Sequence, residues 1–160
     1  MSGGRTHRYP VTVVWTGDRG VGTASYRAYD RDHEIRIAGK PAIAGSSDPA
    51  YRGDAARHNP EDLLVASLSS CHMLWYLHLC AEAGVVVRAY TDEAEGTMVE
   101  DAVRGGWFTR VTLRPRVAIA AGSDTARALS LHAEAHAKCF VANSVNFPVD
   151  HEAIVVAAAD

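Results

Sequence analysis

The sequence contains few cysteines and lacks the motifs of several common enzyme classes. Three cysteines in 160 residues is an odd, small number, which fits a reducing compartment better than a secreted disulfide framework. The chain has no Gly-x-Ser-x-Gly, no P-loop and no His-Glu-x-x-His motif. Acyl transfer, phosphoryl transfer and zinc-protease chemistry therefore have no motif to support them.

Clustered charge and a leader segment are also lacking. The 16 basic and 19 acidic residues form no run of either sign, whereas a nucleic-acid-binding surface usually shows clustered lysine and arginine. The N-terminal stretch MSGGRTHRYP has no apolar core of the kind found in signal peptides. These absences predict a cytoplasmic protein that does not bind nucleic acid.

The most apolar segment is HNPEDLLVASLSSCHMLWYLHLCAEAG, residues 58–84. Asn59 is a good helix N-cap, Pro60 suits the first helical position, and Gly84 is a good stop. Serines and histidines interrupt the segment, so it has no run of 18 apolar residues. We expect a buried core helix rather than a membrane span.

Most of the remaining chain is expected to form strands. The expected strands are 9–16, 22–30, 33–38, 85–99, 107–120 and 151–158, with turns at 17–22 and 100–106. Residues 122–140 predict a second helix that begins near Ser123 or Asp124. Residues 39–58 predict a long loop, either a flap over a site or a solvated insertion. Strands grouped together and separated by helices indicate a single α+β domain over residues 1–160.

Two of the three cysteines lie on the long helix and cannot bond to each other. Cys71 and Cys80 are nine residues apart, hence about 180° around the helix and roughly 13 Å along it. A disulfide needs Cα atoms within about 7 Å. Cys139 lies near the end of the second helix, so Cys71–Cys139 is the pairing that the sequence leaves open. Alternatively, all three are small buried hydrophobic side chains.

Histidines form a second group of candidate site residues. His132 and His136 are four residues apart and Cys139 follows three later, so one helical face can present all three. Zinc accepts such ligands, although a lone His-x-x-x-His occurs often on ordinary surface helices. His72 and His78 are six residues apart and lie on opposite faces of their helix.

Charged residues form the third group. Glu61 and Asp62 suit the positive end of the long helix. Glu61 precedes Cys71 by ten residues, about 15 Å along a straight helix, so it reaches that thiol only from a bent-back loop or from a second subunit. Residues 17–22 (GDRGVG) lack the GxGxxG spacing of a nucleotide-binding loop. Arg19 in this turn is either an exposed hairpin residue or a cation that lowers a thiol pKa.

Three segments together resemble one known family. NPEDLLVASLSSC (59–71) places a thiol ten positions after the Glu of Asn-Pro-Glu, HAKCFVANSVNF (136–147) holds the second cysteine, and WTGDRGVGTAS (15–25) carries an arginine after a glycine-rich turn. This combination resembles the OsmC/Ohr family (osmotically inducible protein C and organic hydroperoxide resistance protein). The resemblance covers most of the chain. It implies an intertwined homodimer in which antiparallel sheets wrap around a long central helix.

The resemblance also implies a function, a thiol-dependent peroxidase that reduces organic hydroperoxides to alcohols without cofactor or metal. It implies that Cys71 is the peroxidatic thiol, Cys139 the resolving thiol, Arg19 the active-site arginine and Glu61 its acidic partner. Arg27 and Arg31 are close enough in sequence to compete with Arg19. A dithiol, either a small molecule or a lipoyl- or thioredoxin-type protein, would reduce the resulting disulfide.

The chain departs from the family pattern at several points. Phe140 and Ala142 stand where the family usually has Pro and Ser, Cys80 is additional, and the 39–58 loop is long. These departures indicate a divergent OsmC-like branch. The alternative function is a non-catalytic protein that binds a small ligand on the same fold.

Overall fold

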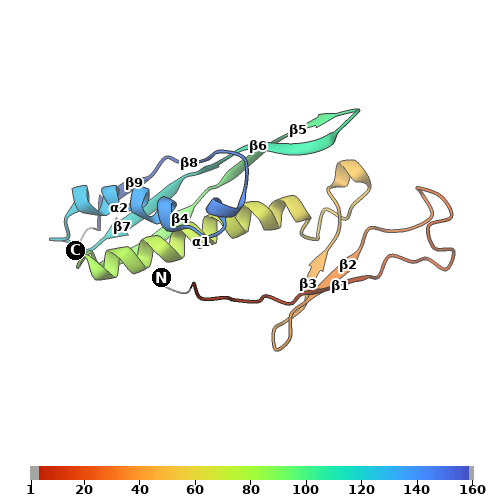
Figure 1. Ribbon diagram of the computed structural model, residues 1–160, viewed down its shortest axis with the longest axis horizontal. Coiled ribbons are helices and arrows are strands. Elements are labelled where there is room, and N and C mark those ends of the chain that lie inside the picture. The colour runs from red at the N-terminus through yellow and green to blue at the C-terminus, as the bar shows by residue number, and fades with distance from the viewer. Residues whose placement is uncertain (1–3, 159–160) are drawn as a thin grey trace. The chain divides into compact units, whose positions relative to one another are not determined.

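A computed structural model gives the structure of the chain and describes residues 4–158 (Figure 1). The first three residues of the stretch searched for a leader segment lie outside the described residues. The chain divides into two compact units, Met1–Leu63 and Leu64–Asp160. Helix α1, Pro60–Glu82, begins in the first unit and continues into the second.

The first unit is built on a three-stranded antiparallel sheet. Its strands are β1 (Thr12–Trp15), β2 (His33–Arg36) and β3 (Ile43–Gly45), in the order β1-β2-β3. The prediction of one long loop over residues 39–58 was therefore wrong in part. That region contains β3 and a short 3-10 helix, η1 (Pro49–Tyr51).

The strand predicted at residues 22–30 is absent from the described part of the first unit. Arginine side chains use the carbonyl groups there that a neighbouring strand would otherwise use. Arg31 stacks on the rings of Tyr26 and Tyr29 and donates hydrogen bonds to both of their carbonyl oxygens. Arg19 donates in the same way to the carbonyls of Arg27 and Ala28.

Both ends of α1 follow the signals in its sequence. The Asn59 Oδ1 accepts a hydrogen bond of 2.7 Å from the Asp62 N–H, which is the N-cap arrangement. At the other end Gly84 has a φ of 72°, and the Val85 N–H bonds back to the Cys80 carbonyl at 2.9 Å. This left-handed glycine ends the helix as a Schellman cap.

The second unit contains two three-stranded sheets and the second helix. Its elements are β4 (Val87–Asp92), β5 (Glu95–Asp101), β6 (Gly105–Leu113), β7 (Pro115–Ile119), α2 (Thr125–Lys138), the 3-10 helix η2 (Ala142–Ser144), β8 (Val149–His151) and β9 (Ile154–Ala157). The strand orders are β4-β7-β9 and β5-β6-β8. The α+β class is confirmed, but the sheets are mixed, since β8 and β9 pair in parallel with their neighbours.

Both long strands predicted from the sequence, 85–99 and 107–120, are divided in two. The division separates β4 from β5 and β6 from β7, whereas the strand predicted at 151–158 is found as β9, preceded by a separate β8. Asp92 lies at the first division, where its Oδ1 accepts the N–H of Arg114, the residue between β6 and β7, at 2.6 Å. The Asp92 carboxylate thus connects the break between β4 and β5 with the break between β6 and β7, and the two sheets diverge from this point.

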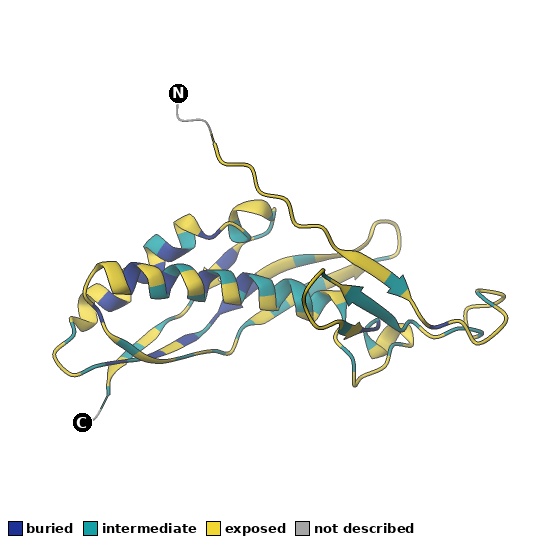
Figure 2. Cartoon of the chain, turned by 90° about the horizontal axis from the view of Figure 1, so that it is seen from below, coloured by how far each residue is buried: buried dark blue, intermediate teal, exposed yellow. Residues whose placement is uncertain are grey.

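Buried residues lie on both helices and on the strands of the second unit (Figure 2), and they form two clusters. The larger one packs α1 and α2 against the β4-β7-β9 sheet and contains Tyr76, Leu79, Cys80, Val85, Val117, Ile119, Ala128, Leu131 and Ala135. The smaller one contains Leu68, Val111, Leu113 and Val149. Burial of each large aliphatic side chain contributes about 1.5–3 kcal/mol.

Helix α1 is the one described helix long and apolar enough to cross a membrane by length and composition. The core helix of a soluble protein meets the same criterion. Here α1 supplies core residues to both clusters, although 28% of its most apolar 18-residue stretch is buried.

Candidate dithiol site

The structure brings Cys71 and Cys139 together from the two helices. Cys71 is half-buried in the middle of α1, and Cys139 is the C-cap of α2, with 1% of its surface exposed. The two thiols lie close enough for Cys71 to affect the pKa of Cys139. All three cysteines of the chain are free thiols. The structure thus places close together the two cysteines whose pairing the sequence left open.

The backbone at the end of α2 determines where the Cys139 thiol lies. Cys139 leaves the helix in an extended conformation, with φ −67° and ψ 111°, while its N–H still bonds to the His136 carbonyl. The Cys139 Sγ accepts the N–H of Ala142 at 3.5 Å. The residue that departs from the family pattern at position 142 thus contacts the thiol through its backbone.

The two thiols of this site lie in different surroundings. Burial raises the pKa of Cys139, and the nearby Cys71 thiol raises it further. Cys139 is therefore a thiol at neutral pH. Cys71 is the more exposed residue of the pair.

Cys80 has no part in this site. It is 1% exposed within the larger core cluster, and burial raises the pKa of its thiol. A buried, protonated cysteine behaves as a small hydrophobic side chain. The packing role left open for Cys80 by the sequence agrees with this position.

Aromatic and basic side chains lie within four residues of Cys71 and Cys139 along the chain. The Trp75 ring meets the Phe140 ring edge to face, with centroids 5.5 Å apart, and the Lys138 ammonium lies 5.5 Å from the Trp75 centroid. Phe140 is 68% exposed. Leu74, Trp75 and His78 line a shallow hollow of about 200 Å³. This face can hold an apolar molecule.

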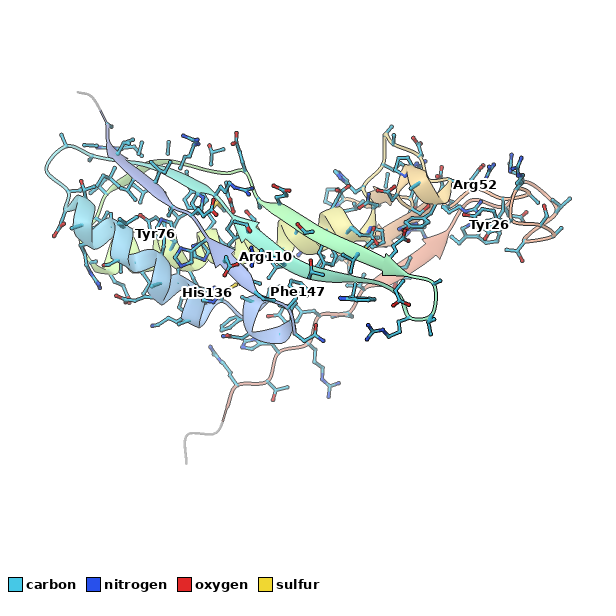
Figure 3. All side chains as sticks on the ribbon, turned by 90° about the horizontal axis from the view of Figure 1, so that it is seen from above. Tyr26, Arg52, Tyr76, Arg110, His136 and Phe147 are labelled. Atoms are coloured by element: carbon cyan, nitrogen blue, oxygen red, sulfur yellow. The ribbon has the colours of Figure 1, made fainter. Side chains whose placement is uncertain are left out.

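A cluster of histidines lies between α1 and α2 and was not foreseen from the sequence. His72 Nε2 is 3.0 Å from His132 Nδ1, and both rings are buried. His151 lies against both rings and His136 lies against His151. Tyr76 and His136, labelled in Figure 3, belong to this region. Sequence spacing gave no signal for a pair 60 residues apart.

The histidine cluster differs from the metal site considered for His132, His136 and Cys139. His132 is bonded to His72, and Cys139 is directed to Cys71. Among residues 4–158, no group of three or more His, Cys, Asp or Glu side chains is arranged to hold a metal ion.

The predicted charged residues, Arg19 and Glu61, belong to the first unit. Arg19 Nε lies 3.7 Å from an Asp30 carboxylate oxygen, and about half of its side chain is exposed. Glu61 is half-buried in the first turn of α1. Among the ion pairs of the described residues, none joins Arg19 to Glu61. Of the competing arginines, Arg31 is held by Tyr26 and Tyr29.

Two helices and six strands in the second unit form an α+β fold of the OsmC type. The OsmC-like protein profile matches residues 53–153. The chain belongs to the OsmC-like protein family. No curated protein sequence matches it.

Solved structures agree with this assignment. An OsmC-like protein of unknown function from Vibrio cholerae is 32% identical, with a TM-score of 0.85 over 93% of this chain and 100% of its own. Two structures with lower identity show the same fold. An organic hydroperoxide resistance protein from Legionella pneumophila is 16% identical (TM-score 0.66, 95% and 98% covered). The organic hydroperoxide resistance protein OhrB of Bacillus subtilis is 19% identical (TM-score 0.59, 94% and 98% covered).

Proposed function

We propose that the protein is a thiol-dependent peroxidase that reduces organic hydroperoxides to alcohols, with Cys71 as the peroxidatic thiol and Cys139 as the resolving thiol. The observation that carries the proposal is the pair of free cysteines that two helices place close to each other. Cys71 is the more accessible residue, which suits the thiol that attacks the peroxide. Cys139 is buried and protonated, which suits the thiol that resolves the sulfenic acid afterwards.

The chemistry balances with these two sulfurs and a dithiol. The Cys71 thiolate attacks the peroxide, so that an S–O bond forms, the O–O bond breaks, and the alkoxide takes up a proton and leaves as alcohol. The Cys139 thiol then displaces hydroxide from the sulfenic acid, which gives a Cys71–Cys139 disulfide and water. An external dithiol reduces the disulfide by two electrons and is itself oxidised to a disulfide.

The proposal includes Arg19 and Glu61, which match the family's motif positions. A guanidinium stays charged at neutral pH and can favour a thiolate. Glu61 would orient it through a bidentate pair. The support for these two roles is the resemblance of residues 15–25 and 59–71 to the family motifs.

We also propose a homodimer, in which a second copy covers apolar surface of the first unit. β1 is an edge strand, and its apolar side chains are exposed, Val13 at 64% and Trp15 at 44%. Natural proteins rarely leave such an edge uncovered. The proposed location is the cytoplasm, where reducing conditions maintain free thiols.

The substrate class follows from the face around Trp75. An aromatic wall of Trp75 and Phe140 and the hollow lined by Leu74 favour a peroxide with an apolar group over hydrogen peroxide. The same hollow supports the alternative function, binding of a small apolar ligand without catalysis.

Thiol counting with one equivalent of cumene hydroperoxide tests the proposal. The wild type should lose two of its three thiols without an intermolecular crosslink. Cys71→Ser should lose none and consume no peroxide, and Cys139→Ser should lose one thiol and yield a sulfenic acid that dimedone traps. Cys80→Ser, the matched control on the same helix, should behave as the wild type.

If Cys71→Ser consumes peroxide at the wild-type rate, the proposal that Cys71 is the peroxidatic thiol is wrong. If the wild type loses no thiols while native mass spectrometry finds a retained small molecule, the binding alternative is correct.

A further inference from the structure

The same two helices are joined by a hydrogen bond between His72 and His132. On α1, His72 is the residue that follows Cys71. On α2, His132 precedes Cys139 by seven residues, which places both on one face of the helix about 10 Å apart. The face of α2 that presents the thiol to Cys71 thus also presents an imidazole to His72.

The geometry of the histidine pair is directional. The rings are parallel within 6°, with centroids 5.3 Å apart and a single N···N contact of 3.0 Å. One imidazole must donate and the other accept, so the pair needs complementary tautomers. A leucine pair of similar volume would fill this space without fixing the two helices at one distance.

Neighbouring residues hold the rings in place. Tyr76 stacks on His132 with centroids 3.8 Å apart and planes within 11°, and His151 packs against both rings from β8. His72 is 1% exposed and His132 is fully buried.

The titratable groups around this pair are few. They are His136 on α2, His151 on β8, Tyr76 on α1, and Tyr90 on β4, which contacts Tyr76. No carboxylate contributes to the pKa of His72 or His132, whereas burial lowers both values. The pair is therefore neutral at pH 7 and acts as a hydrogen bond, not as an ion pair.

We infer that His72 and His132 are positioning residues that fix the distance between α1 and α2 at which Cys71 and Cys139 form a disulfide. The inference rests on the proposed function, since it concerns the same two thiols. A disulfide tolerates only a narrow range of Cα separation. The imidazole bond narrows the range of helix separations in the dithiol state and so raises the effective concentration of one thiol at the other.

The test is the equilibrium of the protein with dithiothreitol at pH 7. Protein dithiol and oxidised dithiothreitol give protein disulfide and reduced dithiothreitol, with two electrons and two protons passing between them. His72→Leu and His132→Leu should each lower the equilibrium constant about tenfold. That factor corresponds to about 1.4 kcal/mol, the size of one hydrogen bond.

Amide variants separate the bond from packing. His72→Gln places an amide where Nε2 lies, and His132→Asn places one where Nδ1 lies, so both should stay within about threefold of the wild type. The swapped amides, His72→Asn and His132→Gln, should lose the bond and behave as the leucine variants. Because all four amides are polar, this comparison remains decisive even where a leucine variant fails to fold.

Leu79→Ala is the control for stability, since it creates a cavity in the larger core cluster of α1. It should lower the free energy of unfolding and leave the disulfide equilibrium unchanged. If the swapped amides retain the wild-type equilibrium, or if Leu79→Ala shifts it as much as they do, the inference is wrong. The dithiothreitol equilibrium contains no peroxide, so it tests the positioning role separately from peroxidase activity. If the variants shift this equilibrium while the wild type does not consume peroxide, the peroxidase proposal is wrong and the positioning role stands.

Discussion

The Ser69 hydroxyl donates a hydrogen bond of 2.5 Å to Asp92 Oδ2, on the carboxylate whose other oxygen accepts the Arg114 N–H. One half-buried side chain therefore ties α1 to the point at which both long β segments break. This contact lies two residues from Cys71 along the helix. It makes Asp92 the structural link between the sheets and the dithiol helix.

Asp92→Ala should reduce the free energy of unfolding by about 1–3 kcal/mol, because it leaves a hydroxyl and a backbone N–H without their charged acceptor. Asp92→Asn should cost less, since one oxygen remains. Urea unfolding measures both. Asp150→Ala is the matched control, as its ion pair with Arg110 is more than half exposed and should contribute less than about 1 kcal/mol. Equal costs at the two positions would contradict the linking role.

Acid should destabilise the protein through its buried histidines. Burial lowers the pKa of His72 to about 4 and of His132 to about 3, from an ordinary value of 6.5. The unfolded chain thus binds protons that the folded chain does not, so stability is complete above pH 6.5 and falls as the pH decreases towards 4. The loss at pH 5 should be about 2 kcal/mol per histidine.

Unfolding in urea between pH 8 and pH 5 measures this loss. The double variant His72→Gln/His132→Asn should show a much flatter dependence, because its amides do not titrate. His78→Gln, an exposed histidine on the same helix, should retain the wild-type slope. A wild-type slope in the double variant would assign the acid sensitivity to other groups.

The sequence predicted those features that local signals determine. Three helix ends depend on only a few neighbouring residues, and all three are found in the structure: the Asn59 cap, the Gly84 stop and the Asp124 cap of α2. The incompatibility of Cys71 with Cys80 followed from helix geometry alone. Each of these features depends on contacts within a few residues or on the regularity of a helix.

Features that depend on distant partners could not be predicted in this way. Residues 85–99 read as one β-rich run, and the break within them depends on Asp92 contacts with Ser69 and Arg114, about twenty residues away in either direction. The His72–His132 pair spans 60 residues. The strand expected at 22–30 is not formed. Instead, Arg19 and Arg31 donate hydrogen bonds to the carbonyl oxygens of residues 26–29.

The assignment of the active-site arginine rests on comparing three variants. Arg19→Gln should reduce peroxide turnover by at least tenfold, because a guanidinium that favours a thiolate accelerates its attack on the peroxide. Arg27→Gln should leave turnover unchanged. Arg31→Gln should loosen the loop held through Tyr26 and Tyr29, which proteolysis can detect. A tenfold loss confined to Arg27→Gln would transfer the role to that residue.

The exposed Phe140 should determine how the protein discriminates among peroxides. Its ring stands edge-on to Trp75, so Phe140→Ala removes one wall of the apolar face while the backbone after Cys139 is retained. We expect the KM for cumene hydroperoxide to rise about five- to tenfold, since one lost aromatic contact is worth about 1 kcal/mol. The KM for hydrogen peroxide, which has no apolar group to bury, should stay the same. Leu129→Ala, an exposed change on α2, controls for nonspecific effects. A parallel rise for both peroxides would show that Phe140 supports the thiol pair rather than the substrate.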